Sequence, residues 1–593
     1  MQQTILVCVA WPYANGYAHL GQIAGAYLPA DICARFHRLR GDRVLMVSGS
    51  DSHGTPVTLQ ADEEGTSPKV VFDKYHDGFL KSFLDLGLSF NLFTHTNTAN
   101  HHRVAQDIFL RLLERGLLFR KTESQIFCEN DRRFLPDRYI YGTCPHCGFA
   151  EARGDQCQHC DHVHDALELG HPQCKLQKAG EAPHRIVVRK TEHYYLNLPA
   201  LEQAILTWFE KETRPWRPNV VNFARNYVAS GLKARAITRD IDWGVPAPIE
   251  GWDSKRLYVW FEAVIGYLSA TIEWASHAGE PDAWKDFWYT PARTYYFVGK
   301  DNVPFHAILW PAMLAGIGDL YDPVLGRSMV LPFDIPANEF MNLEGAKFSK
   351  GDKWAVWLPD ALRRYDADAI RYYLTSIAPE THDSDWSWNG FLHHHNDELV
   401  GAWGKLANRV LTFASQHFDR RVPTPGELEA SDGAILSLVE AGFETVGDML
   451  EHAQFRSALA QLMSIAREAN RYLDDTSPWK CVQADPTKAA KAIFVALRVV
   501  DSLKVMFAPF LPHTAQALHA QLGYDDDLSG HCEIRTFSEA DSTHRALCYA
   551  EPSADNRWKP SRLAPGQSLR DPMPLYQKLD ARIVAEERAR LGK

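Results

Sequence analysis

The sequence has no long apolar run. None of its segments approaches the ~20 consecutive apolar residues that a membrane-spanning helix requires. The amino terminus also lacks a basic segment ahead of its first apolar run, which reaches only to Ala10, so that run predicts a first strand and not a secretion signal. These absences argue against a membrane-spanning or exported protein, and the cytoplasm is the expected compartment.

Cysteine and positive charge are both scarce. The chain of 593 residues has 11 cysteines and no low-complexity tract or internal repeat, which argues against a disulfide-built scaffold or a solenoid. Because 63 Lys and Arg stand against 74 Asp and Glu, for a net charge of -11, any binding of nucleic acid must depend on local basic clusters. The length predicts roughly three to five domains, and a hydrophobic content of 45% is that of an ordinary globular protein.

The first fifty residues predict one βαβ unit. Residues 5–10 (ILVCVA) form an apolar, β-branched run typical of a buried parallel strand. After the loop WPYANGYAHLGQ, residues 23–39 have helical periodicity that stops before Gly41, and the apolar strand VLMVSGSD follows. We therefore expect an open parallel sheet with its ligand at the carboxyl ends of the strands.

Four of the cysteines stand in two closely spaced CxxC pairs, Cys144 with Cys147 and Cys157 with Cys160. Four thiolates at this spacing fit tetrahedral Zn²⁺ with no open position, so we predict a structural zinc ion, one per chain. The alternative, four free thiols in a cytoplasmic protein, leaves the paired spacing unexplained.

The remainder of the chain predicts an insertion and then an all-helical part. From about residue 117 to 239 the cysteine-rich segment and shorter strands interrupt the α/β pattern, which returns at YVWFEAVIGY and RTYYFVGKD. After Asp385, long amphipathic stretches such as residues 396–413, 434–452 and 455–473 predict helices. The predicted fold class is α/β, a Rossmann-like parallel-sheet domain split by a zinc-bearing connective insertion and followed by an all-α domain.

Two short motifs give the first functional signal. HLGQ (residues 19–22) stands where a strand feeds a helix, and free N–H groups at a helix start favour a phosphate, although alone the motif is ordinary turn chemistry. GAKFSKG (residues 345–351) places two lysines around a serine on a glycine-bounded loop. Such a loop is either a solvated basic turn or a mobile clamp on a pyrophosphate as negative charge develops there.

In this order and α/β context, HLGQ and KFSKG resemble the HIGH and KMSKS motifs of the class I aminoacyl-tRNA synthetases. WPYANGYAHLG, GSDSHGTP, YVWFEAVIGY and FVGKDNVPFHAILWPAML are most similar to segments of the methionyl-tRNA synthetases, and the resemblance covers almost the whole chain. It implies an enzyme that activates L-methionine with ATP and Mg²⁺, then transfers it from methionyl-adenylate to the 3′ end of tRNA(Met).

The resemblance also suggests what each part of the chain does. The expected parts are residues 1–116 and 240–330, the two halves of the Rossmann catalytic domain; 117–239, the connective insertion with the zinc knuckle; 331–390, the region of the KMSKS loop and stem contact; 391–548, the helical anticodon-binding domain; and 549–593, a carboxyl-terminal tail.

The resemblance also implies a role for individual residues, position by position in the matched motifs. Asp51 would hold the α-ammonium group of methionine, since a buried carboxylate suits that cation. The residues that would position ATP and stabilise charge during catalysis are His19, Gln22, Lys347 and Lys350. Those lining the methionine side-chain pocket would be Tyr13, Trp260, Ala263, Tyr267 and His306, although without the resemblance core packing would be favoured for the Trp and the second Tyr. Those binding ATP would be Gly21, Gly299, Lys300, Asp301, Ser349 and Lys350.

In the helical part, NRYLDDTSPW (residues 470–479) resembles the anticodon-reading corner of the family. Trp479 would stack on an anticodon base, a contact worth on the order of 1–3 kcal/mol, and Asn470 and Arg409 would add polar contacts. Outside this context, an exposed tryptophan after proline more often packs at a helix end.

Three positions depart from the family pattern: Gln22 ends the HIGH-like motif, Gly351 ends the KMSKS-like motif, and Lys405 stands where asparagine is usual. They keep open a paralogue that makes an aminoacyl-adenylate for a non-tRNA acceptor, and a non-catalytic tRNA-binding protein. The anticodon-like segment argues against the first, and the retained His19 and lysines argue against the second. A synthetase for leucine, isoleucine or valine would need a larger editing insertion. A monomer is expected, because the extra carboxyl-terminal domain that dimerises some relatives is not seen.

Overall fold

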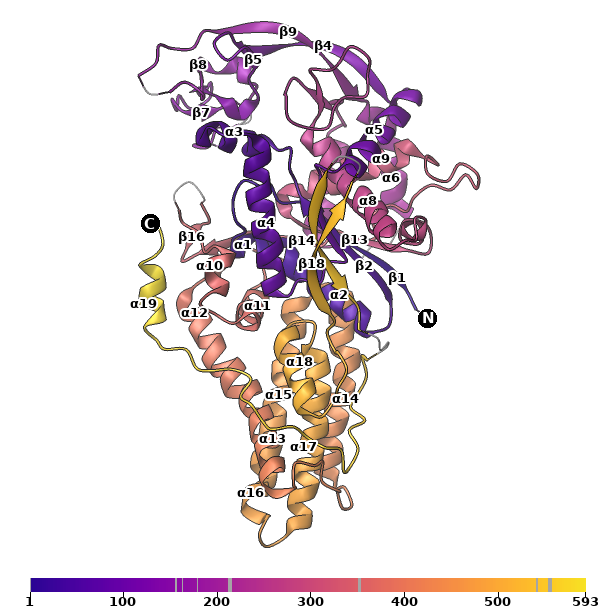
Figure 1. The fold of residues 1–593 in the computed structure, drawn as a ribbon, viewed down its shortest axis with the longest axis vertical. Coiled ribbons are helices and arrows are strands. Elements are labelled where there is room, and N and C mark those ends of the chain that lie inside the picture. Colours follow the sequence, from indigo (N-terminus) through magenta and orange to yellow (C-terminus); the bar gives the residue numbers. More distant parts are fainter. Residues whose placement is uncertain are drawn as a thin grey trace.

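A seven-stranded sheet forms the centre of the protein. The computed structural model describes residues 2–154, 157–160, 162, 164–178, 180–211, 216–349, 353–539, 542–552 and 557–593 (Figure 1). The strand order is β14-β13-β1-β2-β3-β19-β18. β1 (Thr4–Val9) pairs in parallel with β2 (Arg43–Ser50) and β13 (Arg293–Gly299), β2 pairs in parallel with β3 (Leu92–His95), and β13 with β14 (Ala337–Asn338). The predicted parallel-sheet α/β class is confirmed.

The sheet separates two hydrophobic cores. Alternate residues of β1 point to opposite faces, so Ile5 and Val7 belong to one core while Leu6 and Cys8 belong to the other. This arrangement explains why β1 is apolar throughout, since helices cover both faces. The helices of this domain are α1 (Leu20–Gln22), continued by a π-helical segment (Ile23–Tyr27), α2 (Leu28–Leu39), α3 (Thr55–Glu64), α4 (Pro68–Leu86), α5 (Ala99–Glu114), α8 (Val259–His277) and α9 (Trp310–Ile317).

A long two-stranded arm projects from this domain at the expected insertion. β4 (Leu118–Cys128) pairs antiparallel with β9 (Ile186–Leu196) and spans the top of Figure 1. Between the two strands, the chain forms a small module at one end of the arm. The remaining elements of the insertion are β5 (Arg133–Phe134), β6 (Ile140–Thr143), β7 (Ala152–Arg153), β8 (Gly170–Cys174), α6 (Glu202–Lys211), α7 (Pro218–Ala229), β10 (Arg235–Ala236) and β11 (Thr238–Arg239).

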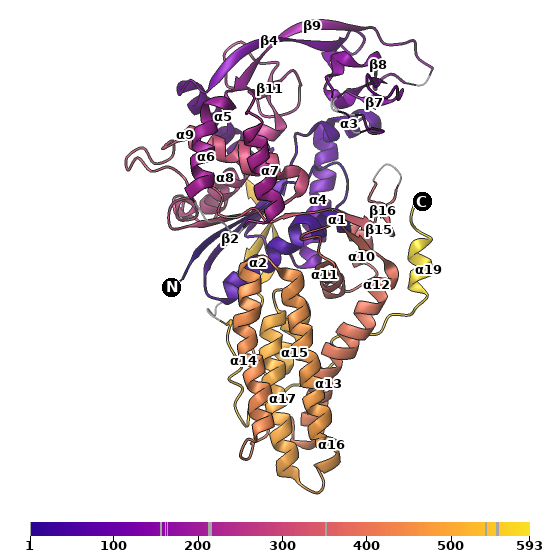
Figure 2. The same ribbon diagram turned by 180° about the vertical axis from the view of Figure 1, so that it is seen from behind.

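A helical bundle lies below the sheet domain, and the predicted all-helical part is confirmed. Figure 2 shows α13, α14, α15 and α17 side by side. The short elements that lead to it are β15 (Met341–Leu343), β16 (Ala346–Lys347), α10 (Leu358–Leu362), α11 (Ala367–Ser376) and β17 (Ser384–Trp386). Earlier in the chain, β12 (Arg256–Leu257) pairs antiparallel with β11 of the insertion, directly before α8. The helices are α12 (Trp388–His393), a π-helical segment (His394–Gly404), α13 (Lys405–His417), α14 (Ala430–Glu451), α15 (Phe455–Thr476), α16 (Pro478–Cys481), α17 (Pro486–Phe507) and α18 (Pro512–Gln521).

The segment after the bundle returns to the catalytic sheet. β18 (His531–Ser538) and β19 (Thr543–Ala550) form a hairpin, and β19 pairs antiparallel with β3, with Leu547 opposite Phe93. Most of this hairpin falls within residues 391–548, the range expected for the helical anticodon-binding domain, and no strand was expected there. A strand gives no local sign of the sheet edge that it will join, because its pairing partner is distant in sequence. The tail then runs along the bundle to α19 (Ile583–Arg588), beside α12 (Figures 1 and 2).

Across the described residues, none of the helices combines the length and the apolar character that crossing a membrane would require.

Candidate active site

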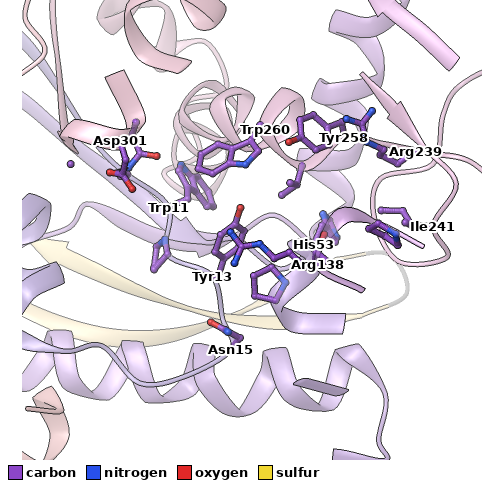
Figure 3. A pocket seen from close by; sticks show the side chains of 18 of the residues that line it. Trp11, Tyr13, Asn15, His53, Arg138, Arg239, Ile241, Tyr258, Trp260 and Asp301 are labelled. Atoms are coloured by element: carbon purple, nitrogen blue, oxygen red, sulfur yellow. The ribbon is translucent and has the colours of Figure 1, made fainter. Parts of the chain in front are cut away.

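A cavity of about 1360 Å³ lies at the carboxyl ends of β1 and β13, where the parallel sheet predicts a ligand. Trp11 and Tyr13 follow β1, Trp260 begins α8, and Asp301 follows β13; Figure 3 shows these side chains around the space. Residues of the β4 strand, such as Gln125, also line it, so the arm forms part of the wall. The cavity is therefore lined by both the sheet domain and the insertion.

The two signature-like motifs meet at this cavity. The His19 ring stacks on the Phe348 ring, with centroids 4.8 Å apart and an interplanar angle of 14°. A Cβ atom added to Gly21 would lie 3.2 Å from both rings, so a larger residue there would push the rings by a few tenths of an ångström. Lys347 lines the same cavity from β16. His19 of HLGQ and the Lys347–Phe348 pair of KFSKG, distant in sequence, thus share one wall of the cavity.

The other predicted residues of the two motifs are placed as follows. The backbone N–H of His19 donates to Gln22 Oε1 at 3.1 Å, so the Gln22 side chain caps the start of α1. Ser349 pairs with Trp354 through its N–H and its C=O, each at 2.9 Å. Lys350 and Gly351 lie outside the described residues.

Asp51 stands at the end of β2 and is only 2% exposed. Its N–H donates to the Pro12 carbonyl at 2.8 Å, and its Oδ1 accepts the His53 N–H at 3.0 Å, which fixes the carboxylate beside Tyr13. Burial raises the pKa of Asp51 well above its usual range, and the negative charge of Glu262 raises it further. A buried carboxylate in such surroundings is stabilised by a cation, so the site suits an ammonium group.

Glu262, which is fully buried on α8, is a residue of the site that the matched motifs did not identify. It accepts hydrogen bonds from His53 Nδ1 at 3.0 Å and from His101 Nε2 at 2.6 Å. Although burial alone would raise the pKa of Glu262, these two histidines hold it at about 2. The signal available in the sequence was an acidic residue inside the apolar segment YVWFEAVIGY, because a buried charge needs partners.

The predicted aromatic pocket divides into two layers. Trp260 lines the cavity and stacks on Phe305, with centroids 4.1 Å apart, and the Tyr13 ring meets it edge-on at 6.1 Å. Tyr267, His306 and Ala263 are buried and are not among the lining residues. The inner layer contacts the outer one through Trp11, whose ring lies 6.4 Å from that of Tyr267.

Tyr267 and His306 form a neutral hydrogen-bonded pair. His306 Nδ1 lies 2.9 Å from the Asn302 carbonyl, which only accepts, so Nδ1 is protonated and Nε2 accepts the Tyr267 hydroxyl at 2.7 Å. Burial lowers the pKa of His306 to about 4, which keeps the ring uncharged near neutral pH. Uncharged, polarizable rings are suitable neighbours for an apolar thioether.

The GKD segment after β13 contributes unequally to the cavity. Gly299 and Asp301 line it, whereas the Lys300 ammonium pairs with Glu339 at 2.7 Å and with Asp383 at 2.9 Å. Lys300 is therefore already neutralised by two carboxylates, and the side of the cavity nearest to β13 presents the Asp301 carboxylate.

The four cysteines converge in the module at the end of the arm. Their sulfurs lie within 4.8 Å of one another, with Cys144 Sγ 3.9 Å from Cys160 Sγ and Cys147 Sγ 3.7 Å from Cys157 Sγ. Although desolvation would raise the pKa of Cys144, the backbone N–H groups of Cys147 and His146 lower it to about 6. Four converging sulfurs, one of them readily ionised, fit a structural zinc site.

A second group of potential ligands lies in the same insertion and was not expected. Cys128, Asp131, Cys174 and His184 also place their ligand atoms within 4.8 Å of one another. Burial raises the pKa of the Cys174 thiol to about 12, and Asp131, whose Oδ2 accepts from that thiol at 3.2 Å, raises it as well. Because these ligands are spread along the sequence and only two are cysteines, spacing gave no sign of them.

The predicted anticodon residues lie in the bundle, far along the chain from the cavity. The Arg409 guanidinium sits 4.6 Å above the ring of Trp479, which is 41% exposed, and also pairs with Asp474 at 2.8 Å. Asn470 instead donates to the Ala402 carbonyl of the neighbouring helical segment at 3.0 Å. Two of the three predicted residues thus stack on one another at a partly exposed surface, and the third joins two helical segments.

Comparison with known proteins agrees with this geometry. The family described as tRNA synthetases class I (M) matches residues 5–411, and the anticodon binding domain of methionyl tRNA ligase matches residues 422–539. The methionine–tRNA ligase of Thermomicrobium roseum is 52% identical over 100% of this chain and 99% of its own length, and that of Roseiflexus castenholzii is 50% identical with the same coverage. The fold is similar to that of Mycobacterium tuberculosis methionyl-tRNA synthetase in complex with methionyl-adenylate, with a TM-score of 0.75, 23% identity and coverage of 97% of this chain and 99% of that one. Because such identity extends over the full length, the chain belongs to the methionyl-tRNA synthetase family of class I aminoacyl-tRNA synthetases.

Proposed function

We propose that this protein activates L-methionine with ATP and transfers it to the 3′ end of tRNA(Met), for both initiation and elongation. The observation that carries the proposal is that His19 and Lys347 line one cavity together with Tyr13 and His53, the immediate neighbours of the buried Asp51 carboxylate. A tRNA-binding protein without catalysis would have no need for a buried carboxylate of raised pKa next to a cavity that also presents His19 and Lys347.

The reaction has two displacements and no covalent enzyme intermediate. An oxygen of the methionine carboxylate attacks the α-phosphorus of ATP in line, the bond to the β-phosphate oxygen breaks, and pyrophosphate leaves. A ribose hydroxyl of the terminal tRNA adenosine then attacks the methionyl carbonyl carbon and expels AMP. His19, Lys347 and Lys350 position the phosphates and offset the charge that moves onto the pyrophosphate, with Gly21, Gly299, Asp301 and Ser349 around the nucleotide.

Methionine binds in this proposal through two contrasting surfaces. Asp51 pairs with the α-ammonium group. Tyr13 and Trp260 at the cavity wall hold the thioether, and the buried layer of Ala263, Tyr267 and His306 completes the pocket behind them. Mg²⁺ accompanies the ATP phosphates, and one Zn²⁺ occupies the four-cysteine site, where it stabilises the end of the arm. We also propose that the protein is cytoplasmic and that it is a monomer. Light scattering of the purified chain tests the second point, because it reports the molar mass in solution.

Replacing a single zinc ligand is expected to empty the four-cysteine site. Cys147→Ser removes one of the thiolates, and three remaining sulfurs bind zinc far more weakly, so the variant should contain one zinc ion fewer per chain than the wild type. Metal content is measured by plasma mass spectrometry. Cys481→Ser, at a half-buried cysteine of the bundle, is the matched control and should retain all of the zinc. Equal zinc content in Cys147→Ser and wild type would contradict the assignment.

Trp479→Ala is expected to weaken recognition of tRNA without affecting methionine activation. Loss of one base-stacking contact costs about 1–3 kcal/mol, so kcat/KM for tRNA charging should fall by about 5- to 150-fold. Pyrophosphate exchange needs no tRNA and should remain at the wild-type rate. An equal loss in both assays would mean that Trp479 supports the fold and does not read the anticodon.

The proposal as a whole is tested by charging transcribed tRNA that bears a CAU anticodon with radiolabelled methionine, beside pyrophosphate exchange with every amino acid. Exchange and charging that depend on methionine would support it. Adenylate formation without charging would indicate a paralogue with a non-tRNA acceptor. Binding of tRNA with neither activity would indicate a non-catalytic protein.

A further inference from the structure

Three potential metal ligands meet where the end of α8 lies against the β18–β19 hairpin. Glu273 and His277 belong to α8 and His544 belongs to β19, and their ligand atoms all lie within 4.8 Å of one another. Glu273 Oε1 is 3.0 Å from His544 Nε2 and 3.6 Å from His277 Nε2. Two imidazole nitrogens therefore face one carboxylate oxygen.

These distances suit a small tetrahedral ion. Nitrogen and oxygen ligands lie ~2.0–2.1 Å from zinc, which places two ligands of a tetrahedron about 3.3 Å apart. The nitrogen–oxygen separations of 3.0 and 3.6 Å in the structure lie on either side of that value. Little movement of the side chains would be needed to admit the ion.

The surrounding structure holds the donors in place. Glu273 and His277 are one helical turn apart and share a face of α8. Glu273 is 4% exposed and accepts the Thr94 hydroxyl of β3 at 2.7 Å. The His277 ring stacks on Phe537 of β18, with centroids 3.6 Å apart. Such orienting contacts around the ligands are typical of metal sites.

An ion pair between Glu273 and a protonated His544 accounts for one contact, and helical spacing brings His277 near Glu273. Neither accounts for the convergence of both imidazole nitrogens on the same carboxylate oxygen, with all three ligand atoms within 4.8 Å. We propose that Glu273, His277 and His544 bind a divalent transition-metal ion, Zn²⁺ in particular. Two imidazoles and one carboxylate are a donor set of zinc sites that keep a fourth position for water, and the 24% exposure of the His277 side chain provides the solvent access.

The ion would fasten the hairpin that follows the helical bundle to α8. The opposite end of this helix bears Trp260 and Ala263, the residues assigned to the methionine pocket. The metal would thus connect the part of the chain that leaves the bundle with the element that forms the pocket wall. The inference does not depend on the proposed function, because it concerns ligands outside the cavity.

The test is zinc content of the full-length protein after equilibrium dialysis against buffered Zn²⁺. His277→Ala and His544→Ala should each hold one zinc ion fewer per chain than the wild type, and added Zn²⁺ should raise the melting temperature of the wild type more than that of either variant. His393→Ala is the matched control, since His393 pairs with Asp397 at 2.6 Å on an exposed helix face and belongs to no group of three ligands found among the described residues. The cysteine-bound zinc is common to all four proteins, so the difference isolates this site.

Equal zinc content in the wild type and His277→Ala would overturn the proposal and leave the Glu273–His544 ion pair as the account of the cluster. If His544→Ala does not fold, His277→Ala decides alone, because its side chain is partly exposed. No step of the test measures aminoacylation, so failure here is distinct from failure of the proposed function.

Discussion

Asp51→Asn should lower kcat/KM for methionine in pyrophosphate exchange by about 30- to 1000-fold. Removing the charge of one partner in a buried ionic contact costs about 2–4 kcal/mol of binding free energy. In this variant the α-ammonium group of methionine would be left without its counter-charge. The substitution preserves shape, and the amide oxygen that it introduces can still accept the N–H of His53. The loss should therefore fall on methionine, while KM for ATP and the melting temperature stay close to those of the wild type.

The pH profile distinguishes a charge effect from a change of shape. The pKa of Asp51 is raised, and only the ionised carboxylate binds the ammonium group, so kcat/KM for methionine should fall as pH drops through that raised pKa. In Asp51→Asn this acidic limb should disappear. An identical limb in both proteins would assign the titration to another group, and an unchanged kcat/KM would remove Asp51 from the methionine site.

The fold was predictable where local pattern and long-range packing agree. The apolar run at residues 5–10 could only be a strand with both faces covered, and β1 has that position. The amphipathic stretch at residues 455–473 likewise became α15, which packs in the bundle. The β18–β19 hairpin was not predicted, because its partner β3 stands several hundred residues earlier and no local feature selects a sheet edge.

The candidate site was predictable for a different reason. Matched motifs named His19 and Asp51, but the networks that set their properties are formed by residues distant in sequence. Glu262 affects Asp51 only because α8 brings it to the end of β2, and Phe348 orients His19 only because the two loops meet. Pair spacing revealed the CxxC cysteines, whereas the ligands Glu273 and His544 are adjacent only in the folded chain. Functional residues at a fixed short spacing can be recognised in a sequence, whereas functional residues that only the fold brings together cannot.

One departure from the family pattern has a structural explanation. Gln22 stands at the end of the HIGH-like motif, where it accepts the backbone N–H of His19 and so caps the helix that the motif begins. Its contribution is to hold the loop and not to supply charge, which a neutral amide does adequately. The substitution therefore keeps the HIGH-like segment in place without adding a charge at the cavity wall.

His19→Ala should lower kcat for pyrophosphate exchange by about 100- to 1000-fold, with little change in KM for methionine. Removing one group that stabilises developing charge in a preorganised site typically costs about 2.7–4 kcal/mol, and this cost appears in the transition state and not in ground-state binding. Steady-state and single-turnover kinetics of adenylate formation measure this loss in kcat. Phe348→Ala is the informative companion, because it keeps the imidazole but removes the ring stacked on it, and should give a smaller loss. A rise in KM for methionine with unchanged kcat in His19→Ala would instead make this histidine part of the substrate pocket, and the motif would then orient methionine and not the phosphates.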